Sequence, residues 1–207
     1  MDITDLLQGP MKNIIVSQLG SQLGLGNDQK TNTAIDGILG TLLNGIMQNA
    51  STPEGQQSLE NALEKDHNGS IFDDLTGFLT GTNKPANPKT SNGAGILKHI
   101  LGDQEENTVE SISKASGIDT QKILTMMMTL APIVLGMLGK SKAQATPQPG
   151  GGSLFDIIKG ATQTVNKQSS TQNILNSILD KDGDGSIVDD IASMASKSIF
   201  GSLFGKK

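Results

Sequence analysis

Apolar side chains near the start of this 207-residue chain recur with the period of an α-helix. They fall at i, i+3, i+4, i+7, i+8, i+11 and i+12, which is one stripe along a helix, whereas a strand would need a period of two. This spacing predicts a long helix from about Asp28 to Asn49, whose stripe consists of Ile35, Ile38, Leu39, Leu42, Leu43, Ile46 and Met47.

Neighbouring helices are marked by their start and stop signals. Residues 11–23 have similar apolar spacing and are followed by Gly24 and Gly26, which favour a helix end. Ser51-Thr-Pro-Glu54 matches a Ser-x-x-Glu capping box with proline in the first turn. We therefore expect another helix from this box to about Leu63.

A helix–turn–helix outline occurs twice, although the repeat is weak. Aligning Val16 with Val109 places Gly24 on Gly117, and a two-residue insertion then brings Asp28 onto Asp119. The outline also occurs in DNA-binding motifs. Neither copy offers the basic surface that phosphate contacts need, so the repeat predicts architecture rather than nucleic-acid binding.

The segment 123–139 carries no charge over its length. It is at the lower limit for crossing a bilayer, and lysines at both ends give no orientation bias. Pro132 lies within it, and consecutive methionines at 126–128 point around the helix. We therefore expect a buried central helix, kinked near Pro132, with the methionines as adaptable core filling.

These patterns together predict an all-α fold built from small bundles of short amphipathic helices. Two stretches rich in Pro, Gly, Asn, Ser and Thr, at 80–95 and 140–153, are expected to be flexible linkers. They divide the chain into an N-terminal helical domain at 1–79, a second helical unit at 96–139 that packs on the first, and a C-terminal helical hairpin at 154–207.

Composition removes several classes of function. The chain contains no Cys, which excludes disulfides, thiolate nucleophiles and zinc ribbons. Its sixteen basic residues are all Lys and its formal net charge is -5. Without a guanidinium fork or a basic balance, we expect no nucleic-acid partner. The N-terminus lacks a secretory signal, so we expect an unprocessed cytoplasmic protein.

A second repeat, at an offset of 116 residues, contains the strongest candidate for an ion site. Residues 59–75 align with residues 175–191 and share the order helix, acidic glycine turn, helix. In the later copy the turn matches the first eight positions of an EF-hand calcium loop, with side-chain oxygens at alternate positions, Gly185 at the sharp bend and a backbone carbonyl at Ser186.

The match ends before the loop closes. Position twelve, where an EF-hand has a bidentate Glu, is Ile191, and the nearest carboxylates are Asp189 and Asp190. We therefore expect weak binding, with a Kd of about 10⁻⁴ to 10⁻³ M. The predicted calcium ligands are Asp180, Asp182, Asp184, Ser186, Asp189 and Asp190.

The earlier copy is a poorer match, because Asn68 replaces one carboxylate and His67 stands at the bend. Another interpretation explains both copies without an ion. Ser70 and Ser186 would cap the following helices, with Asp73 and Asp189 near the helix N-terminal amides.

Catalytic motifs are absent from the sequence. The histidines, His67 and His99, lie in different pieces, and His99 is expected on a helix surface. No GxSxG, HExxH or P-loop pattern occurs. We therefore expect no enzyme activity.

An ordered series of short motifs resembles a known family. The series includes Leu19 to Leu25, Ile38 to Ile46, Ser51 to Gly55, Asn68 to Leu75, Gly93 to Gly102, Ser116 to Asp119 and Leu130 to Gly136. It is similar to the bacterial domain of unknown function 937 (DUF937), which includes YidB-like proteins. The resemblance covers about 3–140 and implies an all-helical bacterial protein, with no catalytic residues to transfer. The last fifty residues depart from it.

The leading hypothesis is a non-enzymatic structural or interaction module with a degenerate EF-hand-like calcium loop, acting on a protein partner or by self-association. The alternative is a peripheral membrane or oligomerising protein without a metal, in which the Asp loops are helix caps. It rests on apolar residues at 155–158 and 199–204 beside the two terminal lysines.

Overall fold

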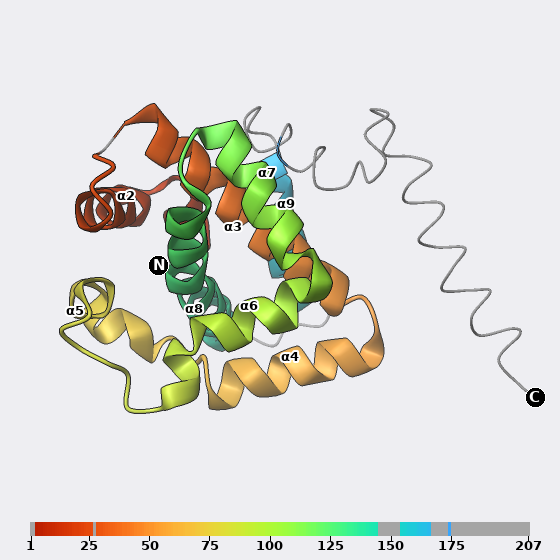
Figure 1. The fold of residues 1–207 in the computed structure, drawn as a ribbon. Coiled ribbons are helices and arrows are strands. Elements are labelled where there is room, and N and C mark those ends of the chain that lie inside the picture. Colours follow the sequence, from red (N-terminus) through yellow and green to blue (C-terminus); the bar gives the residue numbers. More distant parts are fainter. Residues whose placement is uncertain (1–2, 27, 145–153, 167–173, 175–207) are drawn as a thin grey trace, which may run out of the picture.

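The computed structural model describes residues 3–26, 28–144, 154–166 and 174. These residues form an assembly of α-helices with short 3-10 turns and no strand, which confirms the predicted all-α class (Figure 1). The helices are α1 (Ile3–Gln8), α2 (Pro10–Gln22), α3 (Gln29–Asn49), α4 (Pro53–Lys65), α5 (Leu75–Thr80), α6 (Gly93–Leu101), α7 (Glu105–Ser116), α8 (Thr120–Gln144) and α9 (Leu154–Asn166); the 3-10 turns are η1 (Ser70–Asp74), η2 (Pro88–Ser91) and η3 (Gly102–Gln104).

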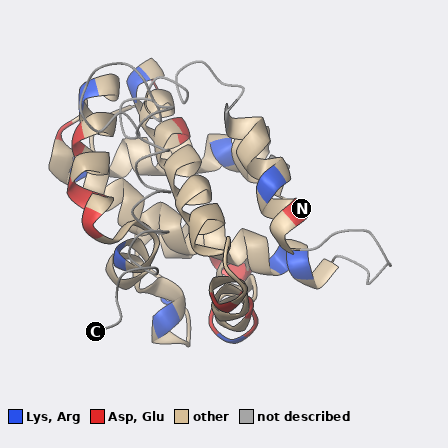
Figure 2. Cartoon of the chain, turned by 90° about the vertical axis from the view of Figure 1, so that its right-hand side faces the viewer, with Lys and Arg blue, Asp and Glu red and all other residues tan. Residues whose placement is uncertain are grey.

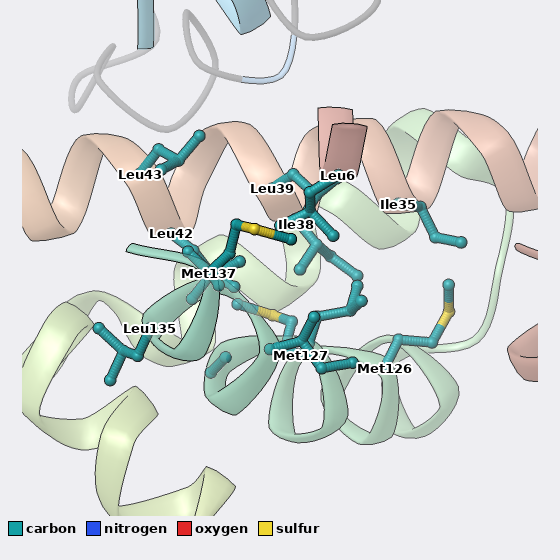
Figure 3. Packing of buried hydrophobic residues seen from close by; sticks show 14 of the residues in the cluster. Leu6, Ile35, Ile38, Leu39, Leu42, Leu43, Met126, Met127, Leu135 and Met137 are labelled. Atoms are coloured by element: carbon teal, nitrogen blue, oxygen red, sulfur yellow. The ribbon is translucent and has the colours of Figure 1, made fainter. Parts of the chain in front are cut away.

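The long helix predicted from the apolar stripe is α3, and it forms the centre of the fold together with α8. In Figure 3, Ile38 and Leu42 of α3 reach toward Met127 and Met137 of α8, and all four side chains are fully buried. Helices α6, α7 and α9 also pack against α3. Contacts on several sides explain why burial in α3 extends beyond the apolar stripe to small or uncharged residues, namely Thr31, Ala34, Gly37, Gly40 and Thr41.

The charge-free segment lies within α8, which is long and apolar enough to cross a membrane, alone among the helices of the described residues. However, 72% of its apolar window is buried inside the protein. Met126 and Met127 are fully buried, as expected for core filling, and Pro132 lies inside the helix. The prediction of a buried central helix is confirmed.

The weak sequence repeat corresponds to two helix–turn–helix units, α2 with α3 and α7 with α8. Each turn contains a glycine in the left-handed region, with φ of +64° at Gly24 and +69° at Gly117. Each second helix starts after an aspartate cap. The Asp28 carboxylate accepts from the Thr31 amide at 2.9 Å, and the Asp119 carboxylate accepts from the Gln121 amide at 2.9 Å. Both second helices are the buried central helices.

The start of α4 differs by one residue from the sequence prediction. The cap is Thr52, whose hydroxyl accepts a hydrogen bond from the Gly55 amide at 3.1 Å, rather than Ser51. The reason is Pro53, which occupies the first helical position and makes the preceding residue the cap. A Cβ at Gly55 would collide with the Asn49 carbonyl oxygen, so glycine allows this close turn.

The predicted linker at 80–95 connects α5 to α6, and most of its residues are exposed. It nevertheless contains η2, and α6 begins inside it at Gly93. Thr90 is buried, and its hydroxyl donates a hydrogen bond to the backbone carbonyl of Asp66. Of the second predicted linker, residues 140–144 continue α8, and the remainder lies outside the described residues.

Helix α9, the start of the predicted C-terminal hairpin, packs against α1, α3 and α8. Its inner face is buried in the same apolar cluster as the rest of the protein through Leu154, Ile158, Ala161 and Val165. The described residues therefore share one core. Charged positions lie on several elements, and Figure 2 shows lysines spread over them rather than gathered into one stripe.

Candidate functional site

The earlier acidic turn, which follows α4, does not gather its carboxylates. Glu64 points to Lys142, with its Oε1 2.8 Å from the lysine Nζ. The Asp66 Oδ1 accepts a hydrogen bond from the Asn87 amide nitrogen at 2.9 Å, and its Oδ2 lies 3.9 Å from the Lys89 Nζ. These acidic side chains therefore bind partners from α8 and from the 80–95 segment.

The turn itself depends on Asn68 and Gly69. The Asn68 side-chain oxygen accepts from the Ser70 amide at 3.1 Å, and Gly69 has φ of +95° and ψ of 0°, in the left-handed region that favours glycine. This glycine corresponds to position six of the EF-hand pattern, where the chain must bend sharply. Ile71, two residues later, is buried in the core.

The capping prediction for this turn, with Ser70 as the cap and Asp73 near the helix amides, was wrong about the capping residue. Ser70 makes no side-chain cap, because residues 70–74 form a 3-10 turn that delays the α-helix. Asp74 caps α5 instead of Asp73. Its Oδ1 accepts from the Gly77 amide at 2.8 Å, and its Oδ2 accepts from the Asn83 side-chain amide at 2.9 Å. These hydrogen bonds lower the pKa of Asp74 below its ordinary value.

Within the part of the chain that the structure describes, no group of three or more His, Asp or Glu side chains is placed to hold a metal ion. The predicted calcium ligands of the later copy all lie outside the described residues: Asp180, Asp182, Asp184, Ser186, Asp189 and Asp190.

A cavity of about 670 Å³ lies beside the earlier turn, where α4 runs beneath α6 in Figure 1. Its walls come from α3, α4, α6, η2 and α8. The apolar lining consists of Ile46, Leu59, Ala62, Ile96, Ile100 and Leu135, and the polar lining includes Asn49, Ser58, Asp66, His67, Lys89, Asn92 and His99.

The two histidines therefore line one cavity, although they are far apart in the sequence. His99 is exposed on α6, as predicted. His67 is only 4% exposed, and its Nδ1 has no hydrogen-bond partner among the described residues. Burial lowers the pKa of His67 below 6.5, and the nearby Asp66 charge opposes this shift only in part. His67 is therefore a neutral, buried imidazole at neutral pH.

The sequence alone did not predict this cavity. It depends on α4 reversing the chain so that residues 62–67 return to α6 and α8. The available signal was His67 itself, a histidine two residues before the Gly69 bend of an acidic turn, where the later copy has Gly183.

A family model described as bacterial protein of unknown function (DUF937) matches residues 5–141 and 153–207. The chain belongs to this family. The match corrects the expectation that the last fifty residues depart from the DUF937 pattern, because the family model also covers the later acidic repeat.

Membership in DUF937 assigns no role to any residue, since the family is described only as bacterial and of unknown function. No curated protein and no solved structure matched the chain. Functional inference for this DUF937 protein therefore rests on its own turns, cavity and core.

Proposed function

We propose that this DUF937 protein is a non-enzymatic interaction module whose later acidic loop, residues 180–191, binds calcium weakly. The observation that supports this proposal is the backbone of the earlier copy. Gly69, which corresponds to Gly185, adopts φ of +95° between two helical segments. The same sequence pattern is therefore able to form the sharp bend that a calcium loop needs at its sixth position.

Side-chain differences between the copies favour an ion in the later one. In the earlier copy, Glu64 and Asp66 are bound to Lys142, Asn87 and Lys89. The later copy has Asp at the first, third and fifth positions, and Gly183 replaces the buried His67. Three oxygen ligands and a small residue at the fourth position suit a hard cation better than the earlier set does.

The role of the ion in this proposal is structural. Calcium orders the loop and fixes the angle between its flanking helices, which presents them to a protein partner or to a second copy of the chain. A cytoplasmic location is part of the proposal; the burial of α8 argues only against this helix crossing a membrane. Nucleic acid is not proposed as a partner, because the second helix of each helix–turn–helix unit is buried in the core.

Isothermal titration of calcium into the full-length protein tests the proposal. A Kd of about 10⁻⁴ to 10⁻³ M is expected, lost in Asp182→Asn and kept in the matched variant Asp66→Asn at the corresponding position of the earlier copy. Absence of heat up to 10⁻² M calcium overturns the proposal. So does an unchanged titration after Asp182→Asn.

A second candidate is an oligomerising or peripheral membrane protein without a metal, in which both acidic loops are helix caps. Asp74 favours it, because in the earlier copy this aspartate caps α5 and needs no ion. Of the apolar residues of α9 that motivated membrane binding, Ile158 is fully buried, Ile157 is half-buried and Phe155 is 37% exposed. Light scattering and liposome flotation in EDTA test this candidate, and a soluble monomer overturns it.

A further inference from the structure

A second hollow, separate from the cavity beside His67, lies at the start of α7, and we call it the α7 groove. Its volume is about 670 Å³, and its walls come from the end of α6, η3, the first turns of α7 and the start of α8. Val109, which is 8% exposed, and the partly buried Leu124 make part of its lining apolar. This volume is in the range of sites that enclose small molecules, roughly 300 to 1,000 Å³, so the groove has room for a few apolar side chains.

Acidic side chains predominate among the charged groups that line the α7 groove. The charged lining consists of four carboxylates and one ammonium group: Asp103, Glu105, Glu106, Glu110 and Lys98. Among the described residues, Glu110 alone of these acids has an ion-pair partner, the exposed Lys114 at 3.5 Å. In the cavity beside His67, by contrast, one acid and one lysine lie 3.9 Å apart and balance each other. The α7 groove therefore favours an occupant that is both apolar and positively charged.

The end of the sequence has this chemistry and has no part in the proposed calcium loop. Residues 192–207 contain three lysines and no acid. Within them, Ile199, Phe200, Leu203 and Phe204 fall at i, i+1, i+4 and i+5, a spacing that would place all four on one side of a helix. Two of the lysines follow directly, at 206 and 207. Apolar and basic residues thus occur together in 199–207, as the groove requires.

The path of the described chain brings this segment near α7. Ile174 is 1% exposed, and a Cβ at Gly37 of α3 would lie 2.6 Å from its side chain and 3.6 Å from that of Ile112 on α7. Helix α7 is roughly 18 Å long, and the intervening residues 175–198 would span roughly 36 Å even as one continuous helix. A tether of this kind gives an effective concentration of about millimolar, so even a weak contact is populated within one chain.

We propose that the α7 groove is the docking site for residues 199–207 of the same chain, whose apolar side chains pack on Val109 and Leu124 and whose lysines pair with the acidic lining. The contact holds the chain on the far side of the calcium loop, as Ile174 holds it on the near side. It does not use the predicted calcium ligands. Its test therefore uses EDTA throughout, so that this proposal and the calcium proposal succeed or fail independently.

A spin label on the segment tests the contact in the full-length protein. The chain has no cysteine, so Gly205→Cys carries a single nitroxide. We expect the nitroxide to weaken the amide signals of Glu106, Val109 and Leu124 by about half or more, relative to the reduced label. Salt at about 1 M should restore much of the signal, because it screens the ionic contacts. Signals at the groove that do not respond to the label overturn the proposal.

Charge reversals show whether the acidic lining selects the segment. Asp103→Lys with Glu106→Lys should abolish the signal loss in the labelled chain. Lys206→Glu with Lys207→Glu should do the same, and combining all four changes should restore it, because the charges are then exchanged. A combined variant that shows no signal loss overturns the ionic part of the contact and with it the proposal.

A matched control and an apolar variant complete this series. Glu54→Lys with Asp73→Lys makes the same change in net charge at exposed positions outside the lining and should leave the signal loss unchanged. Phe200→Ser with Phe204→Ser keeps every charge and should abolish it. Persistent signal loss in this serine variant would show that the lysines alone find the acids, which overturns docking in the groove.

A mixed sample identifies which chain supplies the segment. Spin-labelled chains without ¹⁵N are mixed with ¹⁵N chains that have no label, and the groove signals should then stay unchanged. Signal loss in the mixture assigns the groove to a second copy and overturns docking within one chain. If the groove signals never respond and the protein floats with phosphatidylglycerol vesicles, the segment binds membranes instead, which also overturns the proposal.

Discussion

The ammonium group of Lys122, in the first turn of α8, donates a 2.8 Å hydrogen bond to the backbone carbonyl of Leu23 at the end of α2. This contact joins the two helix–turn–helix units across 99 residues of sequence. The last carbonyls of a helix have no partner within the helix and carry a partial negative charge. The half-buried Lys122 therefore provides a hydrogen-bond donor for this carbonyl. Its positive charge also interacts favourably with the negative end of the α2 dipole.

Replacing Lys122 with Met keeps the aliphatic stem and removes this contact. We expect Lys122→Met to lower the free energy of unfolding by about 1–2 kcal/mol, because a hydrogen bond to a charged donor is lost. Urea unfolding followed by circular dichroism at 222 nm measures the change. Lys114→Met is the control, since Lys114 pairs with Glu110 on an exposed helix surface at 3.5 Å and should contribute at most about 0.5 kcal/mol. Equal effects of the two substitutions would contradict the expectation.

Local patterns in the sequence predicted those parts of the fold that depend on local forces. The period of the stripe at 35–47 predicted α3, and the glycines at 24 and 117 predicted the two turns, because neither depends on distant partners. Cap positions shifted by one residue where Pro53 or a 3-10 turn moved the helix start. These shifts depend on backbone geometry that a list of capping residues does not contain.

Long-range relationships were not predictable in the same way. His67 and His99 share a cavity only because α4 returns the chain to α6, and the composition of 80–95 gave no indication that Thr90 would bind the Asp66 carbonyl. Nor did the linker at 140–153 predict that α9 would add its face to the same core. The calcium ligands at 180–190 remain a prediction from sequence.

Buried threonines offer a second prediction. Thr108 and Thr31 are both fully buried, but the Thr108 hydroxyl has no hydrogen-bond partner among the described residues. Thr108→Val should raise the free energy of unfolding by about 1 kcal/mol, because valine has the same shape and removes an unsatisfied polar atom.

Thr31→Val is the matched control for this change. The Thr31 hydroxyl bonds to the Gly26 carbonyl and to the Asp28 carboxylate, each at 3.1 Å, so its loss should destabilise the protein by about 1 kcal/mol. Urea midpoints of both variants measure the two effects. Destabilisation by Thr108→Val of the same size as by Thr31→Val would show that the Thr108 hydroxyl has a partner.

A third prediction concerns the acidic turn and distinguishes the capping residue Asp74 from its neighbour Asp73. Asp74→Ala should lower the melting temperature, because the Gly77 amide and the Asn83 side chain lose their acceptor. Asp73→Ala, one residue earlier on an exposed position, should leave it nearly unchanged. Thermal unfolding at pH 7 compares the two.

The pKa of Asp74 adds a dependence on pH to this comparison. Because its folded-state pKa is lowered, its stabilising contribution is present above the unfolded value of 3.8 and is lost as the pH falls through the folded value. The difference between wild type and Asp74→Ala should therefore shrink in strongly acidic solution. A difference that stays constant to low pH would show that the carboxylate charge has no part in capping α5.

The buried imidazole of His67 makes the stability of the protein depend on pH in a higher range. Burial lowers its folded-state pKa below 6.5, while the unfolded chain keeps the ordinary value. The unfolded state therefore binds a proton more readily, and protonation favours unfolding. Stability should be at its maximum above about pH 7, fall as the pH drops below 6.5, and stop falling for this reason below the folded-state pKa.

Urea midpoints between pH 7.5 and pH 5 measure this slope. His67→Gln should remove it, whereas His99→Gln, at the exposed histidine of the same cavity, should keep it. A slope that survives in His67→Gln would assign the pH dependence to another group.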